Sequence, residues 1–585
     1  MCGIVGLIGN KSAGEKCYSA LEKLEYRGYD SAGIACLNKK QIDVYKKQGM
    51  VINIREYAKK CNSNVVIAHT RWATHGAPSE QNAHPHLSFD GASAVVHNGI
   101  IENYKGIKDS LIKQGVTFVS ETDSECIVNL YATKSGKAVE KLSQTIKDLE
   151  GSYAVCIIDK KEKCILATRK KSPLYVAYTS QGVMVCSDIS CFEGYAKEYY
   201  SLEEGQIAYL KPRKIKILDC NLKQTKPKFT PLKATQEEND KDGFDFYMQK
   251  EINQIPAIIK RIISSYKYSN LLDDVKLLFE DVNKIVLIGC GTAYHASCYG
   301  AKVLQKELKI ECQAYIASEY RYSDNLIDNK TIAIFVSQSG ETADTLACAN
   351  LCKKYGAKTL VITNVEHSAL ARLCDKYLPV FAGKEVAVAS TKAYVAQILV
   401  LYILSRALID CEYDFADIEP LPELAKKLLN IPEQVLDVVK QSSKVFFLGR
   451  QLDYITALEG ALKLKEISYI GAEGYAAGEL KHGTLALIEE DVPVVVFATQ
   501  KELLEKTLNN AHECKARGAK IIFVAPESFG VADNDYKIDL PNELNTELLS
   551  IIDIIPFQIL AFKTSEALGY NPDKPRNLAK SVTVE

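Results

Sequence analysis

The pattern of apolar and polar positions changes once along this chain of 585 residues. In the N-terminal part, to about residue 225, short β-rich runs occur at residues 65–68, 94–96, 153–158 and 183–186. Helical patterns separate these runs, for example at residues 15–25 and 124–133. The pattern predicts a sheet covered by helices, without a regular strand–helix alternation and without a heptad repeat.

In the C-terminal part, strands and helices alternate, and the alternation occurs twice. The first copy has β-branched runs at 284–289, 331–336 and 359–363, and the second has them at 444–449, 492–497 and 521–524. Uninterrupted apolar runs between helices are typical of parallel strands that are buried on both faces. We therefore expect two doubly wound domains, with ligands bound beyond the carboxyl ends of the strands.

A polar, charged stretch at residues 226–245 is typical of a linker. The expected organisation is an N-terminal domain at 1–225, this linker, two domains at 246–425 and 426–568, and a closing tail at 569–585.

Composition narrows the class of protein. The chain is 47% hydrophobic and 25% charged, as in ordinary globular proteins, and its net charge of −1 gives no reason to expect a nucleic-acid or anionic membrane partner. The 18 cysteines form no Cys-x-x-Cys pair, which favours reduced, buried thiols over a disulfide framework. No signal peptide is recognisable, and the longest apolar run, 393–405, is too short to span a bilayer. We expect a soluble, cytoplasmic protein.

The first residues contain a candidate nucleophile. If Met1 is removed, Cys2 carries a thiol and a free α-amine on one residue. The amine has a pKa of about 7.7–8.0 and the thiol about 8.5, so the amine can accept the proton of the thiol near neutral pH. The alternative is that Cys2 only packs at the start of a strand.

Five of the nine histidines lie between residues 69 and 97: His69, His75, His84, His86 and His97. A zinc site is one interpretation, but this stretch has no cysteine, and its carboxylates, Glu80 and Asp90, form no recognised metal signature with the histidines. The other interpretation is hydrogen bonding to loop backbone. We expect no metal.

The Asn98-Gly99 pair that follows could supply two oxyanion donors, a side-chain amide and a closely approaching backbone N–H, or it could form a hairpin turn.

Five short motifs connect these features: residues 2–6, 26–33, 70–76, 97–99 and 121–125. In type and order they resemble the glutamine amidotransferases with an N-terminal cysteine nucleophile, which implies an αββα N-terminal-nucleophile fold. The resemblance implies that Cys2 attacks the glutamine amide while Asn98 and Gly99 hold the oxyanion. Arg71 would pair with the α-carboxylate and Asp123 with the α-ammonium of glutamine. Thr74 and His75 would line the pocket, and Trp72 would gate an ammonia channel.

Two loops of the C-terminal part have phosphate-binding character. Residues 289–294 suggest a dinucleotide loop, but Tyr294 fills the position where close packing needs a small residue. Residues 337–342 place three hydroxyls and a glycine before a helix expected at 343–355, which predicts a phosphate site; a simple N-cap would explain only one hydroxyl. The matching stretch of the second copy, 498–502, lacks the glycine and serines, so one phosphate site is expected for the two copies.

These loops resemble those of sugar isomerase (SIS) domains, which bind phosphosugars. The resemblance implies contacts to the sugar phosphate from these residues: Thr292, Ser337, Gln338, Ser339, Thr342, Val388 and Ser390. Ala293 departs from the serine that is usual at its position.

Glu459, Lys463 and Glu466 lie at i, i+4 and i+7, on one face of a predicted helix. By pattern alone this could be a solvated ion-pair face. The whole chain, however, resembles the bacterial family of isomerising aminotransferases that use L-glutamine and D-fructose 6-phosphate, which implies a homodimer and no cofactor.

By this resemblance, Lys580 would form a Schiff base with the open-chain ketose, and Glu466 would move a proton between C1 and C2. Glu459 and Lys463 would support that transfer, and His482 would assist ring opening in its own or a neighbouring subunit. Thr484 replaces the proline that usually follows the His-Gly pair.

Two other functions compete with this one. An amidotransferase that makes phosphoribosylamine would need a pyrophosphate-binding domain, which the duplicated phosphosugar domains disfavour. A non-catalytic phosphosugar-binding regulator would have no reason to keep Cys2, Glu466, His482 and Lys580 together.

Overall fold

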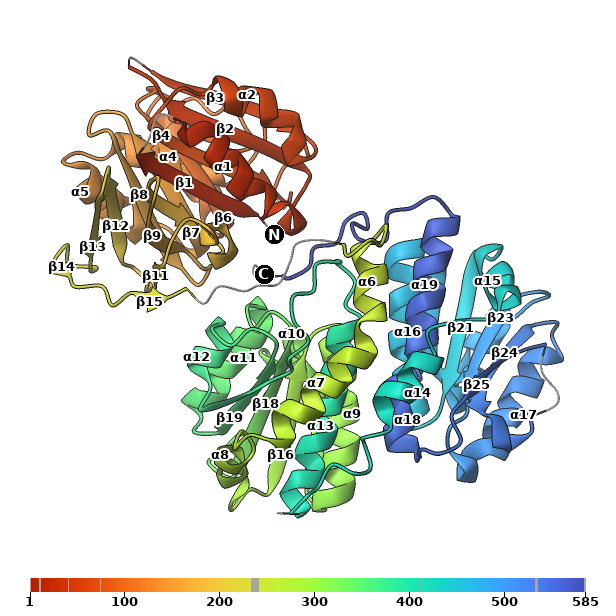
Figure 1. The fold of residues 1–585 in the computed structure, drawn as a ribbon. Coiled ribbons are helices and arrows are strands. Elements are labelled where there is room, and N and C mark those ends of the chain that lie inside the picture. Colours follow the sequence, from red (N-terminus) through yellow and green to blue (C-terminus); the bar gives the residue numbers. More distant parts are fainter. Residues whose placement is uncertain are drawn as a thin grey trace. The chain divides into compact units, whose positions relative to one another are not determined.

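The computed structural model describes residues 2–9, 12–39, 41–73, 75–232, 241–410, 412–531 and 535–582, with the backbone alone of Tyr26. The chain divides into two compact units, one within the described residues up to 232 and one within 241–580. Each is described by itself (Figure 1).

The first unit contains two antiparallel sheets. The order of the first sheet is β15–β11–β9–β10–β1–β4–β2–β3. Its strands are β1 (Gly3–Gly9), β2 (Ser31–Leu37), β3 (Ile42–Gln48), β4 (Val65–Arg71), β9 (Tyr175–Thr179), β10 (Gly182–Cys186), β11 (Glu198–Ser201) and β15 (Thr230–Pro231). The order of the second sheet is β14–β13–β12–β8–β7–β6–β5. Its strands are β5 (His86–Leu87), β6 (Ser93–Ile101), β7 (Gly151–Asp159), β8 (Cys164–Lys170), β12 (Ile207–Lys211), β13 (Lys214–Leu218) and β14 (Gln224–Thr225).

The alternation of side chains along β1 shows how the layers form. Ile4 and Ile8 enter a core between the two sheets, whereas Val5 and Leu7 enter a core beneath α1 (Ala13–Glu22) and α2 (Arg55–Lys60). A third core joins the second sheet to α3 (Tyr104–Lys113), α4 (Ser124–Thr133) and α5 (Ala138–Lys147). The four layers confirm the predicted αββα fold.

The second unit contains two parallel five-stranded sheets. The order of the first sheet is β17–β16–β18–β19–β20, with β16 (Lys284–Gly289), β17 (Glu311–Ile316), β18 (Thr331–Ser337), β19 (Lys358–Thr363) and β20 (Lys376–Pro379). The order of the second sheet is β22–β21–β23–β24–β25, with β21 (Lys444–Gly449), β22 (Gly471–Ala476), β23 (Pro493–Phe497), β24 (Lys520–Pro526) and β25 (Tyr536–Leu540). The two predicted doubly wound domains are thereby confirmed.

Helices between the two sheets share one continuous apolar core. They include α6 (Tyr247–Asn253), α7 (Ile255–Lys267), α9 (Thr292–Leu308), α13 (Lys392–Ile409), α16 (Leu452–Ser468), α18 (Thr546–Ile552) and α19 (Ile555–Ala567). Pro256 lies in the first turn of α7, where a missing N–H costs nothing, and so separates α7 from α6. On the outer faces lie α11 (Ala343–Lys354) and α17 (Leu504–Lys515).

By length and composition, two helical stretches among the described residues could cross a membrane: Lys392–Ile409 and Thr546–Ala567. They are 83% and 94% buried inside the protein, so both are core helices.

One disulfide is present in the described part of the chain. It joins Cys36 on β2 to Cys61, which follows α2. The expectation of reduced thiols is wrong at this pair, because the spacing of cysteines along a chain does not reveal which of them meet in space. The other described cysteines are free thiols.

Candidate active sites

Cys2 lies at the entrance to β1, between strands β4 and β10. The antiparallel register places Gly3 opposite Thr70, which brings Trp72 beside the thiol. The backbone N–H of Trp72 donates to Cys2 Sγ over 3.3 Å. Burial raises the pKa of the Cys2 thiol, while the Trp72 amide and the Arg71 guanidinium act in the opposite direction. A base is therefore needed to form the thiolate at neutral pH.

Asn98, on β6, faces Cys2 in a fixed orientation. Its Nδ2 donates to the carbonyl oxygen of Cys2 over 2.9 Å, and its Oδ1 accepts from His69 Nε2 over 3.0 Å. His69 Nε2 also contacts the carbonyl oxygen of His97 at 3.0 Å. Since two acceptors surround this nitrogen, it must carry the proton, and the amide of Asn98 cannot flip without losing a hydrogen bond.

Gly99 follows with φ of 133°, in the region that favours glycine. A Cβ at this position would lie 2.0 Å from the carbonyl oxygen of Ser152. No side chain fits against the neighbouring strand β7, so the pairing of β6 with β7 requires glycine here.

Arg71 and Asp123 offer charges of opposite sign near the thiol. Arg71 Nη2 donates to the carbonyl oxygens of His75 and Gly76, whereas its buried Nη1 has no hydrogen-bond partner in the protein. Asp123, which precedes α4, accepts from the Ile101 amide at 2.7 Å. Burial lowers the pKa of Arg71, and the charges of Cys2 and Asp123 oppose that shift. These three groups therefore form one electrostatic cluster.

The remaining predicted residues of this site have aromatic neighbours. Trp72 meets the ring of Tyr29 edge-on at 6.1 Å, and His75 meets that of Tyr104 at 5.2 Å. Thr74 lies outside the described residues.

Four histidines of the first unit are buried: His69, His84, His86 and His97. Burial lowers the pKa of each, and that of His69 to about 3, so all are neutral at pH 7. Each hydrogen-bonds backbone or side-chain groups, for example His97 Nδ1 with Ser124 Oγ at 2.8 Å and His86 Nε2 with Thr122 Oγ1 at 3.0 Å. The part of His69 in orienting Asn98 was not expected from the sequence, because it depends on the pairing of two separate strands.

In the second unit, the predicted charged face of α16 is buried. Glu459 and Lys463 have no exposed side-chain surface, so the solvated ion-pair interpretation is wrong. Lys463 Nζ lies 2.7 Å from Glu466 Oε2 and 3.4 Å from Glu459 Oε1, and these carboxylates raise its pKa in spite of burial.

Two residues of α9 complete this cluster. Thr292 Oγ1 accepts from Lys463 Nζ over 3.0 Å and donates to Glu459 Oε1 over 3.0 Å. His295 Nδ1 lies 2.7 Å from Glu459 Oε2. Thr292 was a predicted sugar contact, whereas His295 was not singled out.

Lys580, in the tail, forms a buried ion pair with Glu385, a residue that the sequence did not reveal. Glu385 lies in the loop between β20 and α13, and Lys580 keeps the pKa of its carboxyl at about 2 against the effect of burial. The charge of Glu385 also raises the pKa of Lys463, so Glu385 interacts electrostatically with both Lys580 and the cluster on α16.

His482 is placed differently from these residues. It ends the 3-10 helix Ala477–His482 and is exposed, so it is not part of the buried cluster of one chain.

Hydrogen bonds within the loop after β18 involve the hydroxyls that were predicted to bind phosphate. The Gly340 amide donates to Ser337 Oγ over 3.0 Å, and the Glu341 amide donates to Ser339 Oγ over 3.2 Å. Thr342 is the N-cap residue of α11. Gly340 has φ of 64°, and a Cβ there would lie 2.1 Å from Ser368 Oγ. Glycine is thus required for the turn.

The remaining predicted contacts lie in this loop or in the loop that carries Glu385. The backbone carbonyl oxygen of Gln338 accepts from the backbone N–H of Asn364 over 3.3 Å. The Val388 amide donates to the carbonyl oxygen of Asp573 in the tail over 3.2 Å. The Ser390 hydroxyl donates to Glu385 over 2.8 Å.

The corresponding loop of the second copy is occupied by a side chain of the protein. The buried carboxylate of Asp453, at the start of α16, accepts from the amide and hydroxyl of Thr499 and from Gln500 Nε2, at 3.1, 2.5 and 3.1 Å. Burial raises the pKa of Asp453 to about 6.

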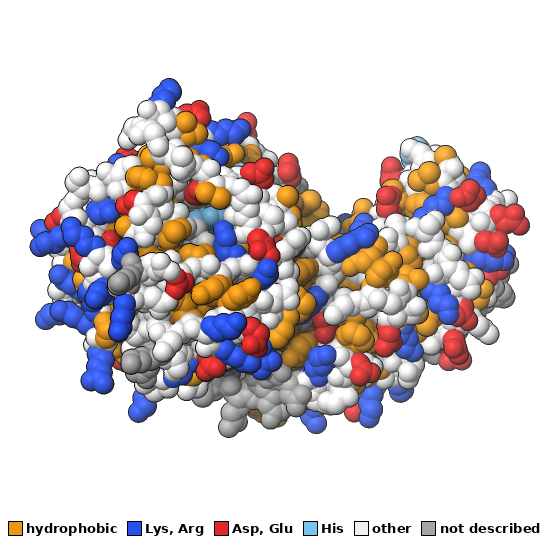
Figure 2. Space-filling model, turned by 90° about the horizontal axis from the view of Figure 1, so that it is seen from above, with side chains coloured by type: hydrophobic (Ala, Val, Ile, Leu, Met, Phe, Trp, Pro, Cys, Tyr) orange, Lys and Arg blue, Asp and Glu red, His pale blue; other side chains and the backbone are white. Residues whose placement is uncertain are grey.

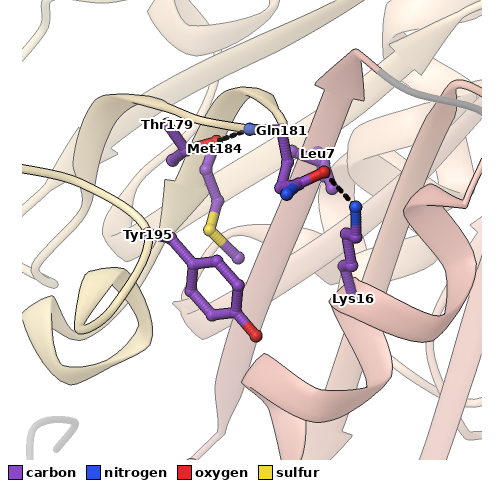
Figure 3. Close-up of a pocket in the computed structure, with 6 residues that line it drawn as sticks. All are labelled: Leu7, Lys16, Thr179, Gln181, Met184 and Tyr195. Carbon is purple, nitrogen blue, oxygen red and sulfur yellow. Dashed lines mark hydrogen bonds between the residues drawn. The ribbon is translucent and has the colours of Figure 1, made fainter.

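A small recess elsewhere in the first unit is unrelated to these sites (Figure 3). Its lining residues are Leu7, Lys16, Thr179, Gln181, Met184 and Tyr195, none of which is a predicted site residue. The face drawn in Figure 2 carries both basic and acidic side chains, as expected for a net charge of −1.

Comparison with known proteins agrees with this division. Residues 69–194 match the glutamine amidotransferase domain family, and residues 278–406 and 439–565 match the SIS domain family. The glutamine–fructose-6-phosphate aminotransferase (isomerizing) of Caldanaerobacter subterraneus is 40% identical over 620 residues, and that of Clostridium tetani is 41% identical over 612. Both alignments cover 100% of this chain and 100% of the relative.

Solved structures match the C-terminal part. The C-terminal domain of glucosamine-fructose-6-phosphate aminotransferase from Francisella tularensis is 35% identical, with a TM-score of 0.55, covering 58% of this chain and 100% of its own. Tagatose-6-phosphate ketose/aldose isomerase from Escherichia coli, 19% identical with a TM-score of 0.50 and covering 56% of this chain and 96% of its own, shares the fold alone.

Proposed function

This chain belongs to the family of isomerizing glutamine–fructose-6-phosphate aminotransferases, and we propose that it converts D-fructose 6-phosphate and L-glutamine to D-glucosamine 6-phosphate and L-glutamate. The observation that carries the proposal is that one chain, related to these enzymes along its whole length, holds two buried polar clusters suited to the two halves of the reaction. The reaction supplies the amino sugar for hexosamine synthesis.

In the first unit, the thiolate of Cys2 attacks the side-chain carbonyl carbon of glutamine. The α-amine of Cys2, free once Met1 is removed, takes the thiol proton. Asn98 Nδ2, which already points at the backbone of Cys2, and the Gly99 amide stabilise the oxyanion. Collapse of this intermediate releases ammonia and leaves a γ-glutamyl thioester, which water hydrolyses to glutamate.

The opposite charges of Arg71 and Asp123 beside the thiol bind the α-carboxylate and the α-ammonium of glutamine. The unpartnered Nη1 of Arg71 is a donor available to the α-carboxylate, and Asp123 attracts the α-ammonium. Trp72, Thr74 and His75 complete the glutamine pocket. Ammonia then passes Trp72 toward the sugar, because in bulk water it would be protonated and lost as a nucleophile.

In the second unit, the loop after β18 binds the phosphate of the sugar. Ser337, Gln338, Ser339 and Thr342 surround a helix N-terminus, where backbone N–H groups and the helix dipole favour an anion. Thr292, Val388 and Ser390 contact the rest of the sugar.

Lys580 forms a Schiff base with C2 of the open-chain ketose, and ammonia displaces it to give fructosimine. Glu466 then moves a proton from C1 to C2, which produces the aldose. The contact of Lys463 with Glu459 and Glu466 supports this transfer, because the ammonium holds both carboxylates in place. His482 assists ring opening from the partner subunit of a homodimer; its exposure supports that role.

One assay tests the proposal: glutamine and fructose 6-phosphate with the purified protein, scoring glutamate and glucosamine 6-phosphate. Both products are expected, with loss of both in C2A and of the amino sugar alone in K580A. Glutamate without amino sugar from the unaltered protein would indicate another amidotransferase, and absence of both products would indicate a phosphosugar-binding regulator.

A further inference from the structure

Glu385 was not predicted from the sequence, yet it contacts the nitrogen that reacts. Its Oε2 pairs with Lys580 Nζ and accepts from Ser390 Oγ over 2.8 Å. Its Oε1 accepts from the backbone amides of Thr391 and Ala393, over 3.0 and 3.1 Å. The side chains of Glu385 and Lys580 are 0% and 4% exposed. Both carboxylate oxygens are therefore held, and the one that faces Lys580 cannot rotate away.

The neighbouring charged groups indicate which carboxylate balances the charge of Lys580. Glu251, on α6, accepts from the amides of Val386 and Ala387, and burial together with the charge of Glu385 raises its pKa to about 8. It is therefore mostly neutral at pH 7. Lys392 donates to Gln254 Oε1 over 3.0 Å, and Lys463 pairs with Glu459 and Glu466. Among these neighbours, Glu385 is the ionised carboxylate in contact with Lys580.

We propose that Glu385 is a catalytic residue of the sugar site, the counter-ion of the Lys580 nitrogen both before the ketose reacts and after the iminium has formed. The inference rests on the Schiff-base role proposed above for Lys580. The ammonium loses one proton, and the neutral amine adds to the C2 carbonyl carbon. The carbonyl oxygen takes up two protons in all and leaves as water.

The sum is an ammonium and a ketone giving an iminium and one water, so the nitrogen carries one positive charge at the start and at the end. A fixed carboxylate in a buried site is complementary to both states and costs no reorganisation between them. A protonated iminium is also more electrophilic at C2 than a neutral imine, so stabilising the protonated form promotes the next step, the attack of ammonia on C2, as well.

The competing interpretation is structural, since Glu385 also ties down the first residues of α13. The two roles differ in pH dependence. A counter-ion sets the pH range in which the nitrogen stays protonated, whereas a loop anchor does not.

The test is borohydride trapping of the Lys580 adduct with fructose 6-phosphate in the full-length protein, measured by mass spectrometry from pH 6 to 10. Loss of an adjacent opposite charge moves a titration by about 1–3 pH units. In E385Q, which keeps the shape and an acceptor oxygen, the alkaline limb of the trapping profile should therefore move about 1–3 units toward acid. On that limb, each unit is about a tenfold loss of trapped product.

E385D draws the carboxylate back by about 1.5 Å, one carbon–carbon bond, and should move the limb in the same direction by less than E385Q does. Glutamate release by the Cys2 site and circular dichroism verify folding. A trapping profile that keeps its position on the pH axis in E385Q would overturn the inference, whatever the yield. If E385Q does not fold, an unmoved profile in E385D would do the same.

K580A separates this inference from the proposed function. Undiminished amino-sugar formation by K580A would overturn the Schiff-base role itself. Loss of trapping in K580A with an unmoved profile in E385Q would overturn only the counter-ion role.

Discussion

The orientation of the Asn98 amide depends on a residue of another strand. His69 is neutral and donates to Asn98 Oδ1, which leaves Nδ2 facing the backbone of Cys2. The proposed oxyanion donor is thus held in one orientation without substrate, so in this role it would need no rearrangement of the protein.

Removing this donor should impair the glutaminase reaction alone. In N98A we expect kcat for glutamate release to fall by about 10²–10³-fold, with a small change in KM, because the contact acts mainly in the transition state. Amino-sugar formation from added ammonium salts, which bypasses Cys2, is the control and should be unchanged. An N98A enzyme with unaltered kcat would show that Asn98 is not an oxyanion donor.

A second residue-scale prediction concerns Glu251. Its pKa in the folded protein, about 8, lies above the ordinary value of 4.5. The folded state therefore holds a proton that the unfolded chain releases, so the stabilisation from this proton is complete below pH 4.5 and is lost as the pH rises through 8.

E251Q resembles the protonated form at every pH. Relative to the unaltered protein, its free energy of unfolding should therefore increase from pH 6 to pH 9, as measured by urea unfolding with circular dichroism. E251D keeps a titratable carboxyl and serves as the control. A difference between E251Q and the unaltered protein that does not vary with pH would contradict the raised pKa.

Sequence reasoning singled out residues that lie in contiguous motifs and missed residues whose contacts depend on the pairing of distant segments. Cys2 and the Ser337–Thr342 loop were recognisable because each motif is contiguous. Glu385 and His69 were not, because their partners Lys580 and Asn98 are brought to them by a tail and by strand pairing. The sequence around two distant residues does not indicate that their side chains will be in contact.

At the scale of elements, central strands were predictable and edge strands were not. The predicted runs at 284–289 and 444–449 coincide with β16 and β21, since strands covered on both faces need unbroken apolar sequence. The edge strand β22 contains Gly-Ala-Glu-Gly-Tyr-Ala and is only partly buried, so it lacks that pattern. The helix predicted at 124–133 matches α4, whereas the one predicted at 15–25 is found at 13–22 as α1.

The four buried histidines on β4, β5, β6 and the loop before β5 predict acid sensitivity of the first unit. The pKa values of these histidines in the folded protein lie below the ordinary 6.5. Below pH 6.5 the imidazoles therefore become protonated in the unfolded chain but stay neutral in the folded protein. Stability should thus fall with decreasing pH, by up to about 1.4 kcal/mol per pH unit for each histidine.

Trp72, the single tryptophan of the chain, reports on this unit. The urea midpoint followed by its fluorescence should decrease steeply from pH 7 to pH 5. H84F, which removes one buried imidazole, is the comparison and should show a shallower slope. A midpoint that stays constant between pH 7 and 5 would contradict the prediction.

At the scale of the whole molecule, the residues proposed for the sugar site come from both SIS copies and from the tail. Thr292 on α9 contacts Glu459 and Lys463 on α16, and Glu385 meets Lys580. A common core of α9, α13, α16 and α19 holds the two copies together, so neither copy has a complete site without the other.

The exposed position of His482 leads to a prediction about subunits. If His482 acts in the partner's site, a dimer of H482A and K580A chains contains one site with both residues intact. Mixing the two inactive variants under conditions of subunit exchange should restore up to about a quarter of the activity of the unaltered protein, because heterodimers form about half of a random mixture and each has one intact site of its two. The product to measure is glucosamine 6-phosphate, and two K580A preparations mixed together are the control. No recovery despite demonstrated exchange would place His482 in its own chain's site.

The side chain of Asp453 occupies the loop of the second copy that corresponds to the proposed phosphate loop after β18. A loop whose donors already bind a carboxylate of the protein has no free donors of that kind for an anionic ligand. Substitutions in the two halves should accordingly separate in kinetics, with KM rising for the loop after β18 and kcat falling for α16.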